Sequence, residues 1–149
     1  MTIFDKIVSG DMKAWVVWQD DEYMAFLTPF ANTPGHTVVI KKENPGDNVF
    51  KVDEESFSGI MHAARTVSRM LENAFDTDRV GVLFDGTGVP HLHAQLIPFH
   101  ENLSQDKELA EKYRKENPQF AHHLTAADGP MMNESELDTI LAKIQKANI

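Results

Sequence analysis

The sequence contains no cysteine, which excludes disulfide bonds, thiolate catalysis and zinc sites built on cysteine. It has no apolar run near the roughly 20 residues of a membrane span. Residues 1–6 lack the basic start and the long apolar stretch of a secretion signal. These absences predict a cytoplasmic protein without a membrane partner.

Positive charge is also scarce. The 149 residues include 14 Lys and Arg against 23 Asp and Glu, a net charge of −9, and the nearest approach to a basic cluster is Lys41-Lys42. Because a protein that follows nucleic-acid phosphates needs a positive surface, we expect no nucleic-acid partner. An acidic protein can still bind one small phosphate ester through backbone N–H groups and a few polar side chains.

The composition of the whole sequence, 42% apolar and 25% charged, is that of an ordinary globular protein. The length suits one domain with one core, and we find no internal repeat. We divide this domain into a core, residues 1–100, and a C-terminal helical extension packed on it, residues 101–149.

Hydrophobic periodicity predicts an α+β fold. Predicted strands come in hairpins and consecutive pairs around one long helix, which favours an antiparallel sheet of about five strands over repeated βαβ units. The predicted strands are 15–18, 22–27, 36–40, 79–84 and 91–98, and the predicted helices are 3–9, 53–75, 104–116 and one that begins with a capping box at 133–136.

The long helix after the predicted N-cap Asp53 has the clearest pattern, and Val52 and Phe57 stand where a hydrophobic staple forms. Its apolar stripe predicts packing against a sheet rather than chemistry. The stripe consists of Phe57, Ile60, Met61, Ala64, Val67, Ser68, Leu71, Ala74 and Phe75.

The segment 91–98 alternates polar and apolar residues, which is the period of a half-buried strand. On such a strand His91, His93 and Gln95 share one face. Three interpretations stay open for these residues alone: an ordinary polar strand face, a catalytic array of imidazoles, or a zinc or copper site built on the His-x-His pair.

Several landmarks then coincide. Five segments occur in the order and spacing of the histidine triad (HIT) superfamily. They are Ile3-Phe4-x-Lys6-Ile7, Asp20-Asp21, Ala25-Phe26, the run Pro34 to Ile40, and His91-x-His93-x-Gln95. Between about residues 3 and 98 the chain therefore resembles a small HIT protein. The resemblance implies a homodimer of five-stranded antiparallel sheets that join across the interface.

The resemblance also implies nucleotidyl chemistry. The middle histidine of the strand, here His93, attacks the α-phosphorus of a nucleotide ester or anhydride and forms a covalent nucleotidyl-histidine, from which water or another acceptor takes the nucleotide. The predicted enzyme is a nucleotide-conjugate hydrolase or nucleotidyltransferase, with no cofactor and no metal. A neutral imidazole is a competent nucleophile for such a two-step displacement.

The implied site has three groups of residues. His91 and Gln95 complete the catalytic array with His93, and His36 lies beside it. The turn 86–89, just before the strand, supplies donors for the phosphate. The implied nucleotide-binding residues are Phe4, Ile7, Phe26, Leu27, Thr28, Thr87, Gly88 and Val89.

The chain departs from the family at several positions. Gln95 replaces the third histidine, and because a carboxamide is no general acid, this puts the cleavage of amine leaving groups in doubt and keeps transfer or phosphorolysis open. Thr28 stands where many members have an acidic residue that holds the ribose. Thr2 and Asp5 replace the zinc-binding cysteine pair of some bacterial members, so we expect no such zinc.

Two alternatives to an enzyme follow. The departures, including an Asp85-Gly86-Thr87 turn without the usual phosphate-binding sequence, suit a nucleotide-binding protein with little catalysis. A His-x-His metal protein is the second alternative. The other histidines are predicted surface residues: His62, His100, His122 and His123.

Overall fold

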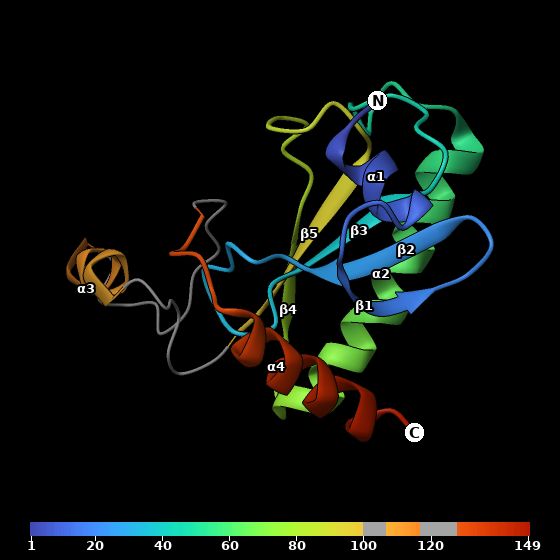
Figure 1. Ribbon diagram of the computed structural model, residues 1–149. Helices are drawn as coiled ribbons and strands as arrows, with labels where there is room; N and C mark the ends of the chain where they lie inside the picture. The colour runs from blue at the N-terminus through green and yellow to red at the C-terminus, as the bar shows by residue number, and fades with distance from the viewer. Residues whose placement is uncertain (100–106, 117–127) are drawn as a thin grey trace.

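The computed structural model describes residues 1–99, 107–116 and 128–149 (Figure 1). His100, His122 and His123, and the predicted start of a helix at 104, lie outside these ranges. The elements are α1 (Ile3–Ser9), β1 (Trp15–Gln19), β2 (Tyr23–Leu27), β3 (Thr37–Lys41), α2 (Glu54–Phe75), β4 (Val80–Leu83), β5 (His93–Pro98), α3 (Lys107–Glu116) and α4 (Glu134–Ala147).

In the described residues the strands form one five-stranded sheet in the order β1-β2-β3-β5-β4, and every neighbouring pair is antiparallel. The predicted α+β fold with an antiparallel sheet is confirmed. The central strand β3 pairs with β2 on one side and β5 on the other, so β5 is held on both edges. This position makes β5 a rigid support for the side chains it carries.

The sheet separates two apolar layers, because successive side chains of a strand point to opposite faces. Ala25, Val39 and Ala94 belong to the larger core cluster, which includes buried residues of α2 and α4. Phe26 and Val38 belong to a smaller cluster with Phe4 of α1. Figure 1 shows α1 and α2 on opposite sides of the sheet.

The predicted strand start at residue 91 is wrong, since β5 begins at His93. The N–H of His91 donates to the carbonyl of Val89 at 2.8 Å, around Pro90, which has no N–H of its own. Because this tight turn uses the N–H of His91, the sheet ladder begins two residues later. His91 is fully buried rather than half-exposed.

The predicted stripe of α2 is displaced around the helix. Phe57 and Met61 are exposed, whereas Ser56 and Ala63 are buried. A Cβ placed on Gly59 would overlap the Tyr23 hydroxyl, so α2 approaches β2 most closely at small residues. Ile60, Ala64, Val67, Leu71 and Ala74 are buried as predicted.

The C-terminal helix α4 is part of the larger apolar layer. Leu137 and Ile144 are fully buried among core residues. At the edge of the sheet, Trp15 Nε1 donates to Asp138 Oδ1 at 2.8 Å. Asn133 caps the helix by accepting from the Glu136 N–H. Across the described ranges, no helix is long and apolar enough to cross a membrane.

Candidate active site

A cleft of about 470 Å³ opens between α1, the turn before β5 and the segment after β2. Its volume lies in the range of small-molecule sites, and its lining is mainly apolar. Most of the sequence-predicted site residues line it: Phe4, Ile7, Phe26, Leu27, Thr28, Thr87, Gly88, Val89, His93 and Gln95. His91 and His36 do not line it and lie behind its wall.

Helix α1 forms one wall of the cleft. It is short, but both of its ends are capped: the Thr2 side chain accepts from the Asp5 N–H in a capping box, and Gly10 ends the helix with a φ of 86°. The Thr2 N–H in turn donates to Asp5, which holds the pKa of that carboxyl below its ordinary value. The helix thereby directs the buried Phe4 ring at the start of β5.

Phe4 contacts both histidines edge to face. Its ring centroid lies 5.5 Å from that of His91 and 5.3 Å from that of His93, and the smaller apolar layer continues through Phe26 at 5.6 Å. Edge-to-face packing of this kind fixes ring orientations as well as burying area. Phe4 is therefore both a wall for a ligand and a support for the histidines.

His93 has a defined tautomer. Its Nδ1 lies 2.7 Å from the carbonyl oxygen of His91, and because a carbonyl only accepts, Nδ1 carries the hydrogen. The other nitrogen, Nε2, is directed toward Asp85, whose Oδ1 is 3.4 Å away. His93 thus presents Nε2 to the cleft from a nearly buried ring.

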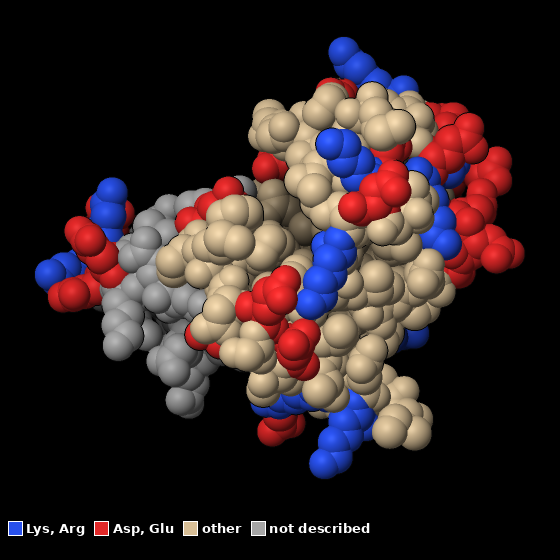
Figure 2. All heavy atoms as spheres, viewed as in Figure 1, with Lys and Arg blue, Asp and Glu red and all other residues tan. Residues whose placement is uncertain are grey.

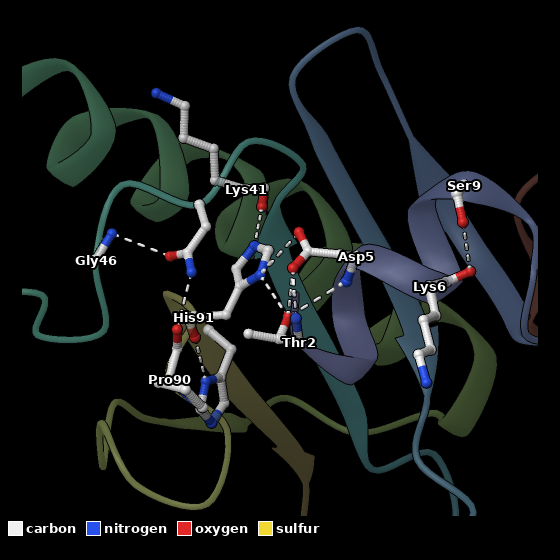
Figure 3. A network of polar contacts seen from close by, with 10 residues as sticks. Thr2, Asp5, Lys6, Ser9, Lys41, Gly46, Pro90 and His91 are labelled. Atoms are coloured by element: carbon white, nitrogen blue, oxygen red, sulfur yellow. Dashed lines mark hydrogen bonds and ion pairs between the residues drawn. The ribbon is translucent and has the colours of Figure 1, made fainter.

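His91 is tied to α1 and β3 (Figure 3). Its Nε2–H donates to the carbonyl of Lys41 at 2.6 Å, and its Nδ1 lies 3.1 Å from the Thr2 hydroxyl. The Asp5 carboxylate is farther away, with its Oδ1 at 3.8 Å from His91 Nδ1. Both ring nitrogens of His91 are thus engaged within the protein, and its carbonyl accepts from His93.

Gln95 has a fixed orientation as well. Its Oε1 accepts from His36 Nε2 at 2.9 Å, while His36 Nδ1 accepts from the Asn32 N–H at 3.4 Å. The amide nitrogen of Gln95 is left to donate to Asp85 Oδ2 at 3.0 Å. Burial lowers the pKa of His36, which favours the neutral ring that this arrangement requires.

The turn before β5 is shaped by two glycines. Gly86 and Gly88 have φ of 67° and 81°, values that side-chain-bearing residues rarely adopt. They let the backbone of 86–89 approach the cleft beside Thr87. Thr28 also lines the cleft, and its hydroxyl accepts from the Phe30 N–H at 3.2 Å.

The comparisons with known proteins are consistent with this geometry. Residues 9–102 match the HIT domain family. The chain belongs to the HIT family.

Its relatives include an uncharacterized HIT-like protein of Saccharolobus solfataricus, 30% identical over 123 residues that cover 78% of this chain and 86% of the relative. The protein hit of Bacillus subtilis is 32% identical over 101 residues, 64% of this chain and 69% of that protein. The fold also resembles a hypothetical histidine triad nucleotide-binding protein of Sulfolobus tokodaii, with a TM-score of 0.74, 19% identity, and coverage of 97% and 89% of the two chains.

This HIT domain also has cleft residues that sequence reasoning missed. Lys13, Asp85 and Asp128 line the cleft and are its described charged residues. The sequence places Asp85 in a turn, and its position just before Gly86, Gly88 and strand β5 is the signal that could have identified it. Lys13 and Asp128 come from loops without a motif, and nothing in their local sequence identifies them.

Three observations describe the surface and the potential metal ligands. His62 is exposed on α2, as predicted. Within the ranges that the structure describes, no group of three or more His, Asp or Glu side chains is arranged to hold a metal ion. On the face seen in Figure 2, the Lys and Arg side chains are scattered among acidic ones rather than gathered in one patch.

Proposed function

We propose that this protein cleaves nucleotide conjugates at the α-phosphorus through a covalent nucleotidyl-His93 intermediate. One observation carries the proposal: the Nδ1–H of His93 is committed to the His91 carbonyl at 2.7 Å, which leaves Nε2 directed into an apolar cleft as a nucleophile. Dividing one displacement at phosphorus into two steps eases each of them.

The cleft suits the rest of a nucleotide. Phe4, Phe26 and Leu27 offer aromatic and aliphatic walls for a base and sugar. In this proposal the backbone N–H groups of 86–89 and the Thr87 hydroxyl donate to non-bridging phosphate oxygens, since Thr87, Gly88 and Val89 line the cleft. Phosphoryl-type transfer depends mainly on such positioning and charge stabilisation.

The roles of the other polar residues follow from their contacts. His91 fixes the tautomer and place of His93 through its carbonyl. Gln95, held by His36, keeps the amide directed at Asp85. An amide in this position leaves open whether water or a second phosphate accepts the nucleotide from His93.

The experiment measures AMP or UMP release from adenosine 5′-phosphoramidate, a diadenosine polyphosphate and a nucleotide sugar. Wild type is compared with His93→Ala and with His62→Ala, a control histidine exposed on α2. Each assay is run with and without inorganic phosphate. Release in water that only His93→Ala abolishes establishes a hydrolase, and product that appears only with phosphate establishes a phosphorylase or transferase. Full turnover by His93→Ala contradicts the proposal.

A nucleotide-binding protein with little catalysis is the second candidate. The observation in its favour is the Asp85 carboxylate, which stands 3.4 Å from His93 Nε2, where an anionic phosphate has to approach. This candidate predicts micromolar binding of AMP by calorimetry with no product from any conjugate. His93-dependent turnover eliminates it.

We also propose that the protein is a homodimer joined through β4. This strand is an edge of the described sheet, and Val82 on it is 41% exposed. An unpaired, apolar edge is a template for pairing with a second chain. Light scattering is expected to give twice the chain mass for wild type and for the control Phe50→Lys, and a lower mass for Val82→Lys. A monomeric wild type contradicts this proposal.

A further inference from the structure

The carboxylate of Asp85 bridges the two polar side chains of β5 that line the cleft. Its Oδ1 lies 3.4 Å from His93 Nε2, and its Oδ2 accepts from Gln95 Nε2 at 3.0 Å. The Asp85 side chain is 25% exposed. Asp85 therefore touches the attacking nitrogen, is held by a neighbour, and remains accessible from the cleft.

The hydrogen bond from His93 Nδ1 fixes the position of the hydrogen on the His93 ring. His93 Nδ1 keeps its hydrogen because it faces the His91 carbonyl. Attack on phosphorus requires the lone pair of Nε2, so His93 cannot also supply a proton from that nitrogen. A proton for the leaving atom at this contact has to come from the neighbouring carboxyl group of Asp85.

The remaining polar groups near the cleft do not provide a proton in the same place. The Gln95 amide neither releases nor takes up a proton in the relevant range. His36 directs its Nε2–H at Gln95 Oε1, behind the cleft wall. Of the other described titratable residues that line the cleft, Lys13 pairs with Glu134 at 3.4 Å and Asp128 belongs to the segment that leads into α4.

We propose that Asp85 is the general acid and base of the reaction, an assignment that rests on the covalent His93 chemistry proposed above. In the first step His93 Nε2 bonds to the α-phosphorus, the bond from phosphorus to the leaving atom breaks, and the Asp85 carboxylic acid protonates that atom. In the second step the Asp85 carboxylate takes a proton from water while the water oxygen bonds to phosphorus and the phosphorus–nitrogen bond breaks. One water is consumed, and both side chains return to their starting state.

This assignment bears on the leaving group. A leaving group that departs as a stable anion needs no proton, whereas an amine does. With Asp85 as the acid, the loss of the third histidine does not exclude amine leaving groups.

The test compares Asp85→Asn with Asp47→Asn, an exposed aspartate whose backbone carbonyl lies beside Gly86. Asparagine keeps the size of aspartate and can accept from Gln95, but it transfers no proton. The substrates are adenosine 5′-phosphoramidate, whose amine needs a proton, and adenosine 5′-(p-nitrophenyl) phosphate, whose nitrophenolate does not. Circular dichroism checks that both variants fold.

For Asp85→Asn we expect kcat/KM on the phosphoramidate to fall by about 100-fold or more, the usual contribution of general acid catalysis. On the nitrophenyl ester, kcat/KM is expected to stay within about tenfold, while kcat falls because water attack lacks its base. Nitrophenolate then appears in a stoichiometric burst, and intact-mass measurement finds one nucleotidyl group on the protein.

Three outcomes overturn the assignment. If Asp85→Asn slows both substrates equally, Asp85 only positions the site, and the covalent mechanism stands. If Asp85→Asn behaves as Asp47→Asn does, Asp85 has no part in the reaction. If wild type turns over neither substrate, or His93→Ala retains turnover, the proposed function fails together with this assignment.

Discussion

His36 Nε2 donates a hydrogen bond of 2.9 Å to Gln95 Oε1, and this contact sets which end of the Gln95 amide faces the cleft. With the oxygen held by His36, the amide nitrogen points to Asp85. A histidine 59 positions away in sequence from Gln95 thereby orients the carboxylate beside His93 without lining the cleft itself.

The same histidine makes stability depend on pH. Burial holds the pKa of His36 below its ordinary value of 6.5, so below about that pH the unfolded chain binds more protons at this site than the folded chain. Stability from His36 is complete above about pH 6.5 and is lost as the pH falls toward the lower folded pKa. Urea unfolding between about pH 7.5 and pH 5 is expected to show wild type losing stability faster than His36→Gln. Parallel pH dependences of the two proteins contradict this account.

Phe4 is expected to affect binding more than chemistry. Phe4→Leu keeps an apolar residue on α1 but removes the edge-to-face contacts with His91 and His93. Such contacts contribute about 0.5–1.5 kcal/mol. We expect KM to rise about two- to tenfold with little change in kcat. The control Ser9→Ala, at an exposed position on the same helix that does not line the cleft, is expected to leave KM unchanged. A loss confined to kcat is the contrary result.

Two glycines offer a matched test of packing behind the site. Gly35 and Gly10 have nearly the same φ, 87° and 86°, so alanine adds a similar backbone strain of about 1–2 kcal/mol at each. A Cβ on Gly35 would overlap the Phe75 ring, whereas a Cβ on Gly10 meets nothing within 4 Å. Urea unfolding should find Gly35→Ala the less stable variant. Equal losses would mean that Phe75 moves aside at no cost.

The C-terminal extension is predicted to belong to the same folding unit. Leu137 is 1% exposed within the core cluster. Leu137→Ala is expected to lower the free energy of unfolding by about 2–5 kcal/mol, and the loss should appear in a single transition. Leu141→Ala, at a partly buried position on the same helix, should cost less. Two separate transitions would instead indicate an independent extension.

Strand β5 shows how much of the candidate site a local sequence pattern can predict. Residues two apart on a strand share a face whatever surrounds them, and therefore His93 and Gln95 were predictable as neighbours. His91 was not, because a hydrogen bond from its N–H to Val89 ends the ladder before it. Similarly, helical spacing predicted most of the buried face of α2, but the close approach of Gly59 to Tyr23 turned Phe57 and Met61 outward.

By itself, then, the sequence determined the periodic elements, the antiparallel class of the sheet and the family motif, because these depend on spacing along the chain. The environment of His93 was decided only by the tertiary structure. The carboxylate of Asp85 meets its Nε2, and the hydroxyl of Thr2 meets His91, across separations that no local pattern encodes. Packing brings these groups together, because such contacts depend on the three-dimensional positions of atoms rather than on residue types.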